Sequence, residues 1–254
     1  MKRIPIAVQL YSVHKSMAKD MEGTIRAVAE IGYKGVEFYS GVEKDAPRVR
    51  KILQETGLRV VGWHSAWDDL TQEHIDDTVR FHKEIGNDCI VVPGLPAEMT
   101  ADAAAWSRTA ALFSAAQKAL TANGLHMGYH NHNTEFTPIS GEDTPWDIIA
   151  KRTPPEFILQ LDNGNAMSGG ADPLKYLKKY PGRARTIHLK PYSFTTKFDT
   201  MIGEDDVQWI ETFEEIERQN ATRWYIMEYE SEALYPSDIE GIRVCFEKLK
   251  AFGL

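Results

Sequence analysis

The sequence predicts an α/β protein, and within that class a single-domain (β/α)8 TIM barrel that covers residues 1–254. Short apolar runs rich in Val and Ile alternate along the chain with longer segments of helical periodicity. Each kind of segment recurs eight times, which is the number of repeats that closes a barrel. With 254 residues, 43% of them hydrophobic, the chain can bury one large core, and barrels of this size are commonly undivided.

The predicted strands are nearly continuous apolar runs, as expected for parallel strands buried on both faces. They are Ile4–Leu10, Gly35–Phe38, Arg59–His64, Cys89–Val92, His126–Asn131, Phe157–Asp162, Arg185–His188 and Trp224–Glu228. The predicted helices are Met21–Ile31, Ala46–Thr56, Gln72–Ile85, Ala101–Asn123, Pro145–Lys151, Pro173–Tyr180, Trp209–Gln219 and Ser237–Phe252. An open, doubly wound sheet is the alternative. It is disfavoured because Tyr11-Ser12-Val13-His14 follows the first strand, where such sheets commonly carry a Gly-rich phosphate-binding turn.

Local signals support several of these helix ends. Gly57 follows a predicted helix at the point where a left-handed residue is favoured. Asp172 precedes Pro173, which is the order of an N-cap residue and a first-turn proline. Ser237 and Glu240 are three residues apart, as a capping box requires.

Composition and charge exclude some kinds of partner. The formal net charge is -8 with acidic and basic residues interspersed, so we expect no nucleic-acid partner. Cys89 and Cys245 are far apart and outside any CxxC spacing, which predicts two buried free thiols. The apolar run near the N-terminus is too short for a membrane span or a secretion signal. We therefore expect no membrane association and a cytoplasmic location; a removed leader and a homo-oligomeric state are left open by the sequence.

Polar residues close the apolar runs, and in a barrel the carboxyl ends of the strands build the active site. These residues are Gln9, Glu37, His64, His130 with His132, Asp162, His188 with Lys190, and Glu228. Taken singly, several have a structural alternative: His64 could bind a backbone carbonyl, and Glu37 could pair with a basic residue of the barrel. Carboxylates and imidazoles from neighbouring strand ends are nevertheless what a divalent ion needs, because its ligands must converge from several directions.

The ends of the last four predicted strands give a candidate metal site. The proposed ligands are His130, Asp162, His188 and Glu228. Two imidazoles and two carboxylates suit one divalent ion, and Mn²⁺, Co²⁺, Mg²⁺, Fe²⁺ and Zn²⁺ all remain open.

Six segments in order along the chain carry a resemblance to a known family. They read VQLYSV, GYKGVEFYSG, GYHNHNTEF, LQLDNGNA, IHLKPYS and YIMEYE. Over almost its whole length the chain resembles the sugar isomerase/epimerase superfamily with the xylose isomerase-like barrel. The resemblance is moderately specific for the fold and metal site, and weak for the substrate.

The resemblance implies a ligand set of Glu, Asp, His and Glu from strands five to eight, and Asp162, His188 and Glu228 match its last three members. His130, in the His-Asn-His form of the fifth strand, stands where the first Glu is usual. A branch of the family carries this form, and a metal is still expected there. The ligand charge changes from -3 to -2 when both imidazoles are neutral, which should make the ion a stronger Lewis acid.

The resemblance also implies roles for residues around the ligands. Glu37 and His64 match the second- and third-strand positions of substrate contact and proton transfer, and Lys190 follows the seventh-strand ligand. His132 and Glu135 would orient a ligand or exchange protons. Glu204, in Gly203-Glu204-Asp205-Asp206, lies where relatives carry a Gly-Glu-Gly loop near the site.

Further substrate contacts are expected from Gln9 and from aromatic rings near the strand ends, which could stack on a sugar or simply pack at the barrel rim. The rings are those of Tyr11, Trp63, Trp67, Tyr129, Tyr192 and Tyr229.

The chemistry that such a site favours is proton abstraction next to a carbonyl, through a metal-stabilised enediolate. Return of the proton gives keto-sugar isomerisation or epimerisation, whereas loss of a β-substituent gives dehydration or elimination from a 3-keto-glycoside or keto-inositol. We expect an isomerase or epimerase, with a lyase as the alternative. A non-catalytic sugar-binding barrel is a second alternative, and it would lack a plausible base. A metal-dependent nuclease of abasic DNA, which shares this barrel, is disfavoured by the acidic charge.

Overall fold

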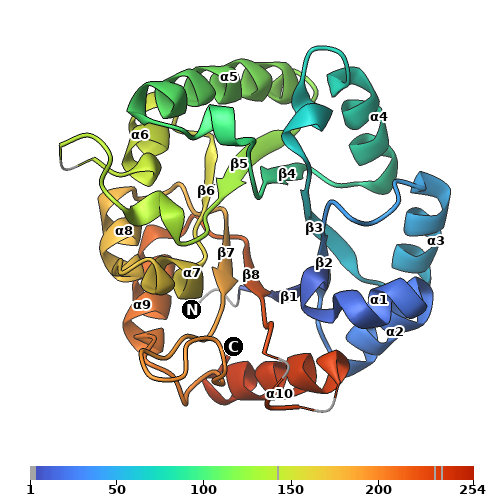
Figure 1. Cartoon of the computed structure of the whole chain (residues 1–254). Coiled ribbons are helices and arrows are strands. Elements are labelled where there is room, and N and C mark those ends of the chain that lie inside the picture. The colour runs from blue at the N-terminus through green and yellow to red at the C-terminus, as the bar shows by residue number, and fades with distance from the viewer. Residues whose placement is uncertain (1–3, 142, 232, 236) are drawn as a thin grey trace.

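Eight parallel strands form a barrel that is surrounded by helices, as the sequence predicts (Figure 1). The computed structural model describes residues 4–141, 143–231, 233–235 and 237–254. The strands are β1 (Ile6–Gln9), β2 (Gly35–Phe38), β3 (Arg59–His64), β4 (Cys89–Val92), β5 (His126–His130), β6 (Ile158–Gln160), β7 (Thr186–Leu189) and β8 (Trp224–Met227). Each predicted strand is present, and the differences from prediction are confined to the strand ends.

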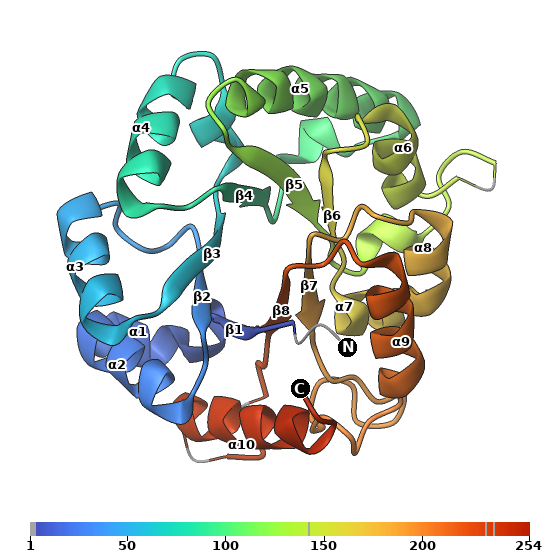
Figure 2. The ribbon, with the colours of Figure 1, turned by 180° about the vertical axis from the view of Figure 1, so that it is seen from behind.

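The helices lie outside the strands all the way round, as the view from behind also shows (Figure 2). They are α1 (His14–Lys19), α2 (Met21–Ile31), α3 (Ala46–Thr56), α4 (Ile75–Ile85), α5 (Ala103–Thr121), α6 (Pro145–Arg152), α7 (Asn163–Ser168), α8 (Pro173–Lys179), α9 (Trp209–Gln219) and α10 (Asp238–Ala251). Four short 3-10 turns lie in the connections between strands and helices of the described residues. They are η1 (Leu10–Val13) after β1, η2 (Trp67–Leu70) after β3, η3 (Ala97–Met99) before α5 and η4 (Thr134–Phe136) after β5.

Two helices, α1 and α7, lie outside the set that the sequence predicts. Helix α7 reads NGNAMS, and its glycine and asparagines are poor helix formers. It forms because the Asp162 side chain accepts a hydrogen bond from the Asn165 backbone, which caps the first turn. Other end signals behave as predicted: Gly57 is left-handed with φ 69°, and Asp172 caps the helix that begins with Pro173.

The core divides into a part outside the barrel wall and a part inside it. Large side chains such as Trp146 and Phe113 pack between the strands and the helices. Smaller clusters, which include Ala7, Cys89 and Ile226, alternate along the strands with residues of that outer core and so point into the barrel. Both cysteines are buried and free, as expected.

The strand ladder is continuous from β6 round through β1 to β7, with one register shift between Val36 and Glu37 where β2 pairs with β3. The seam between β6 and β7 is closed differently. His188 donates its backbone N–H to Leu161 at 2.9 Å, and Asp162 and His188 form an isolated parallel bridge. The Asn163 side chain then binds both the N–H and the C=O of Lys190, at 3.0 and 2.8 Å, as a neighbouring strand would. Asparagine thus extends the seam where the β6 backbone turns into α7.

In the part of the chain that the structure describes, no helix is long and apolar enough to cross a membrane.

Candidate metal and catalytic site

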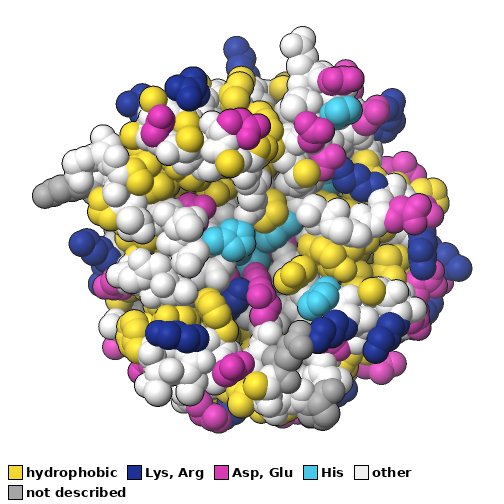
Figure 3. Space-filling model, viewed as in Figure 1, with side chains coloured by type: hydrophobic (Ala, Val, Ile, Leu, Met, Phe, Trp, Pro, Cys, Tyr) yellow, Lys and Arg dark blue, Asp and Glu magenta, His cyan; other side chains and the backbone are white. Residues whose placement is uncertain are grey.

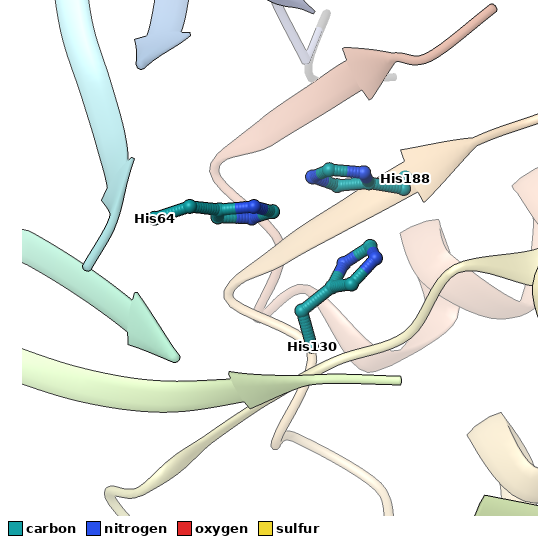
Figure 4. A group of neighbouring side chains, drawn as sticks. All are labelled: His64, His130 and His188. Atoms are coloured by element: carbon teal, nitrogen blue, oxygen red, sulfur yellow. The ribbon is translucent and has the colours of Figure 1, made fainter. Parts of the chain in front are cut away.

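Three imidazoles meet inside the barrel near the carboxyl ends of alternate strands (Figure 4). His64 ends β3, His130 ends β5 and His188 lies in β7. The rings of His130 and His188 have centroids 4.5 Å apart, and those of His64 and His188 are parallel within 7° at 5.5 Å. Side chains from alternate strands share a layer in a barrel interior, so the odd-numbered strands bring these rings together.

Two polar groups from even-numbered strands contact these imidazoles. Glu37 in β2 is fully buried, and its Oε2 lies 2.6 Å from His188 Nε2 and 3.1 Å from His64 Nε2. Burial by itself would raise the pKa of Glu37, but the facing imidazoles hold it well below its usual range. Glu37 is therefore an anion beneath the three rings. Its space depends on Gly62, because a Cβ there would lie 2.3 Å from Glu37 Oε1.

Gln160 at the end of β6 uses all of its polar atoms. Its Nε2 donates to Glu37 Oε1 at 2.8 Å and to Thr186 Oγ1 at 2.9 Å. Its Oε1 accepts from His64 Nε2 at 2.8 Å and from His130 Nδ1 at 3.1 Å. The carboxylate of Glu37 can only accept, so it fixes which end of the amide faces it. His130 accordingly carries its proton on Nδ1, and its Nε2 keeps a free lone pair.

The four predicted ligands converge. His130, Asp162, His188 and Glu228 are all buried, and each offers a ligand atom within 4.8 Å of the others. Asp162 Oδ1 accepts from the Asn165 backbone, whereas Oδ2 has no hydrogen-bond partner among the described residues. A buried carboxylate oxygen without a partner is costly, and burial raises the pKa of Asp162 to about 6. This orphaned oxygen and the N/O donor set fit a divalent cation.

The structure also forms a second group that could hold a metal, His64, His130 and His188. It shares two imidazoles with the first group, so the two describe overlapping positions. The first group is the better fit for a cation because it carries two carboxylates and the unpartnered oxygen.

His188 lies between the carboxylates of Glu37 and Glu228. Its Nδ1 contacts Glu228 Oε2 and lies 3.9 Å from Asp162 Oδ2, while its Nε2 faces Glu37. Burial would lower the pKa of His188, but Glu37 and Glu228 raise it to about 10. A cation at Nδ1 would replace that proton and leave Nε2–H donating to Glu37, which is the usual arrangement of a metal-bound histidine.

A cavity of about 340 Å³ opens above these groups. Figure 3 shows histidine side chains gathered in a hollow at the centre of this face, with an acidic and a basic side chain beside them. The described residues that line the cavity are Gln9, Tyr11, Tyr39, Ser40, His64, Pro93, His130, His132, Asn165, Lys190, Phe198, Glu228 and Glu230.

The cavity presents several groups that could handle a proton. His64 Nε2 is engaged by Gln160 and Glu37, so Nδ1 is its basic atom, which accepts a long hydrogen bond from Gln9 Nε2 at 3.4 Å. Burial lowers the pKa of His132, which keeps that ring neutral. Lys190 Nζ lies 3.1 Å from Glu228 and 2.7 Å from Glu230. Burial opposes its charge, but these carboxylates and Asp162 raise the pKa of Lys190, so it remains a cation.

Four predicted substrate contacts lie away from this cavity. Trp63 is fully buried and stacks on Phe38 with centroids 4.6 Å apart. Tyr192 is buried against Phe194 and Phe198. The place of Trp63 follows from its strand position, which faces the outer core. Gln9 and Tyr11, which are also predicted contacts, do line the cavity.

Glu135 and Glu204, the other two, have partners elsewhere. The carboxylate of Glu135 binds the Tyr129 hydroxyl and the His132 backbone N–H, both at 2.8 Å, so it holds the turn that carries His132. Glu204 is paired with Lys248 of α10 on the outside of the barrel. The next residue, Asp205, turns inward and accepts from Trp209 Nε1 at 2.8 Å, which directs Glu204 outward.

Sequence reasoning missed Gln160, Glu230 and Asn131. Gln160 closes a strand as the predicted residues do, but a carboxamide carries no charge or metal preference to draw attention to it. Glu230 lies two residues beyond Glu228, and strand periodicity alone could have placed it on the same side. Asn131 binds the backbone of Asp162, donating to its C=O at 3.1 Å and accepting from its N–H at 2.8 Å.

Comparisons with known proteins agree with this architecture. Residues 25–245 match the family model described as xylose isomerase-like TIM barrel. One relative is an inosose dehydratase 2 of Bacillus cereus, 26% identical over 66% of this chain and 62% of its own length. Another is an inosose dehydratase from a second strain of Bacillus cereus, 24% identical over 86% of this chain and 85% of its own.

Among solved structures, a sugar phosphate isomerase/epimerase from Parabacteroides distasonis ATCC 8503 superposes with a TM-score of 0.83. It is 20% identical and the match covers 96% of this chain and 97% of that one. At this identity the likeness shows the fold alone. The family match, which covers most of the chain, establishes that the protein belongs to the xylose isomerase-like TIM barrel family.

Proposed function

We propose that this protein is a divalent-metal-dependent enzyme that removes a proton from the carbon next to the carbonyl of a keto-sugar, and so works as an isomerase or epimerase. The observation that carries the proposal is the unpartnered Asp162 Oδ2, buried among three other ligand-type side chains at the base of the cavity. Around it the cavity offers the weakly hydrogen-bonded Nδ1 of His64 and the ammonium group of Lys190, which is held by carboxylates.

His130, Asp162, His188 and Glu228 would hold the ion, with Mn²⁺, Co²⁺, Mg²⁺, Fe²⁺ and Zn²⁺ all compatible with the donor set. When bound, a divalent ion would polarise the substrate carbonyl and stabilise the negative charge that develops as the neighbouring carbon loses its proton.

His64 is our choice for the base. Its Nδ1 accepts only a long hydrogen bond from Gln9, at 3.4 Å, which a substrate would displace, and Glu37, 3.1 Å from Nε2, would stabilise the imidazolium that forms. Glu37 itself does not line the cavity, so we assign it a positioning and charge-stabilising role in place of direct proton transfer.

Two other side chains complete the proposed assignment. Lys190, held as a cation, would donate a hydrogen bond to developing negative charge on a substrate oxygen. His132, neutral and on the cavity wall, is placed to return the proton from another direction. Tyr11 and Tyr39 at the rim offer ring faces for a sugar.

Elimination is the second candidate. It is favoured because two relatives carry the name inosose dehydratase, and dehydration of a keto compound can follow from the same proton abstraction. The substrate would then be a keto-inositol or a 3-keto-glycoside. A non-catalytic sugar-binding barrel is not favoured, because His64, His132 and Lys190 all remain at the cavity.

The experiment strips the protein of metal, reconstitutes it with Mn²⁺, Co²⁺ or Mg²⁺, and incubates each form in D₂O with ketoses, keto-inositols and 3-keto-glycosides. Proton NMR follows deuterium incorporation, and a second assay follows release of water or the glycosidic alcohol. Incorporation without release supports isomerase or epimerase activity, and release supports a lyase. His126→Gln, at the opposite end of β5 from the site, is the control for His64→Gln. Absence of both signals with every metal overturns the proposal.

A further inference from the structure

A second cavity of about 240 Å³ adjoins the one above the ligands. It lies between α1 and the segment that joins β8 to α10, and its lining includes His14, Lys19, Tyr235 and Asp238. Tyr11 and Glu230 line both cavities, so the two meet at this pair of side chains. Tyr11 and Glu230 therefore form the boundary between the two neighbouring cavities.

The boundary between the cavities is built from fixed groups. The Tyr11 ring stacks on His14 with centroids 4.8 Å apart and an interplanar angle of 16°, and it meets Tyr39 edge-on at 5.5 Å. It is nevertheless 44% exposed, which leaves part of the ring available to a ligand. Across the boundary, Glu230 Oε1 is held 2.7 Å from Lys190 Nζ.

The lining of the second cavity suits a neutral, hydroxyl-rich group. Two tyrosine rings, those of Tyr11 and Tyr235, are accessible to the C–H surface of a sugar. Lys15 and Lys19 bring two positive charges to this space, and Glu230 and Asp238 bring two negative charges. Neither a strongly anionic nor a strongly cationic ligand therefore matches the lining throughout. Asp238 is occupied by Ser16, whose backbone N–H lies 3.0 Å from it.

We propose that the second cavity is a subsite for a second sugar ring, joined to the keto ring that sits above the ligands. The substrate class would then be keto-glycosides that carry a glycosyl or similar hydroxylated group, in preference to single-ring keto-sugars. This inference rests on the proposed function, because it assumes that the keto ring occupies the first cavity.

The test measures binding, with metal-loaded protein and calorimetry. The probes are a methyl 3-keto-glucoside and a 3-keto-disaccharide with the same keto ring. The variants are Lys19→Ala, which removes a cation from the subsite, and Ser231→Trp, which fills it. Lys118→Ala is the matched control, because Lys118 and Lys19 are both basic residues in the last turn of a helix. Thermal unfolding checks that each variant is folded.

We expect the disaccharide to bind wild type at least tenfold more tightly than the methyl glycoside, a gain of about 1.4 kcal/mol. Both subsite variants should remove most of that difference and leave the methyl glycoside unchanged, while Lys118→Ala changes neither. Equal binding of the two probes to wild type overturns the subsite and leaves the proposed function standing. If neither probe binds, the subsite and the keto-glycoside substrate class are both overturned, whereas the proposed function itself is decided by the deuterium-incorporation experiment above. Tighter binding of a 3-keto-glucoside 1-phosphate than of the disaccharide would overturn the sugar ring as occupant.

Discussion

Glu37 Oε2 lies 2.6 Å from His188 Nε2, on the side of the imidazole that faces away from Glu228 and Asp162. The two residues are 151 positions apart and come from β2 and β7. A carboxylate at this nitrogen fixes the ring orientation and keeps a proton on Nε2, so that Nδ1 is the nitrogen at which a metal would replace a proton. Glu37 is therefore placed to support the proposed metal site without being a ligand.

Glu37→Gln should weaken metal binding by about 10- to 100-fold, the usual cost of losing a group that orients a ligand. The amide is nearly isosteric, so the barrel should remain folded. It lacks the charge that holds His188, so the ring should be less well oriented. Metal affinity is measured by competition with a chelating dye. The control is Glu55→Gln, which removes a surface carboxylate paired with Arg26. Unchanged affinity together with lost activity would instead assign Glu37 to proton transfer.

His130→Ala should reduce metal affinity more than Glu37→Gln does, because it deletes a ligand. The loss should therefore exceed the about 10- to 100-fold expected for a group that only orients a ligand. Elemental analysis after dialysis reports the metal content. His126→Ala is matched to it in residue type and strand, but His126 lies at the opposite end of β5. If the His130 variant keeps its metal while the control also does, the four-ligand site is wrong.

Asp205 should make the protein less stable as the pH rises towards neutrality. Burial raises the pKa of Asp205 to about 7 from a usual value of 3.8, so the folded state favours the protonated form. Stability from this group is complete below about pH 4 and is lost as the pH rises to about 7, by up to about 1.4 kcal/mol per pH unit. Asp205→Asn should flatten this dependence and be more stable than wild type at pH 8.

Urea unfolding of wild type and the Asp205 variant between pH 5 and pH 8 measures this effect. The gap between the two should widen with pH. Asp76→Asn, an exposed change in the first turn of α4, is the control and should show a constant gap. A constant gap for Asp205→Asn as well would show that the carboxyl group is already ionised across this range.

Addition of metal should stabilise the end of the β6–β7 seam more than the rest of the barrel. Asp162 and His188 face each other across that seam, and both belong to the proposed ligand set. Hydrogen exchange with and without Mn²⁺ should show added protection for residues 159–165 and 186–190 beyond the general rise in stability that any ligand produces. Equal protection of β2 and β3 would contradict this expectation.

The order of the barrel and its four candidate ligands could be predicted because each depends on a local signal. An apolar run closed by an imidazole or a carboxylate indicates both a strand and the end of it that carries a candidate ligand, as at His188 and Glu228. What could not be predicted depends on contacts between distant strands. Whether Glu37 faces substrate or supports His188 is decided by β2 and β7 lying across the interior, and nothing near Glu37 in the sequence records it.

The substrate contacts were the least predictable part. Trp63 and Tyr192 are aromatic residues near strand ends, but strand periodicity turns Trp63 towards the outer core and Tyr192 is covered by its own loop. Glu204 lies in a segment without regular structure, where it pairs with Lys248 while the neighbouring Asp205 accepts hydrogen bonds from Trp209 Nε1 and the Val207 backbone. Loop side chains are set by such contacts, which residue patterns do not encode.

The seam between β6 and β7 is where the wall of the barrel closes into one ring. Its end is made by Asn163, Asp162 and His188, which also form or adjoin the proposed metal site. An ion bound there would link the two strands of the seam, because Asp162 and His188 lie on opposite sides of it. Loss of the ion would loosen the wall at the place where the substrate is held. A substitution that lowers the metal affinity should therefore also lower the rigidity of the barrel at this seam.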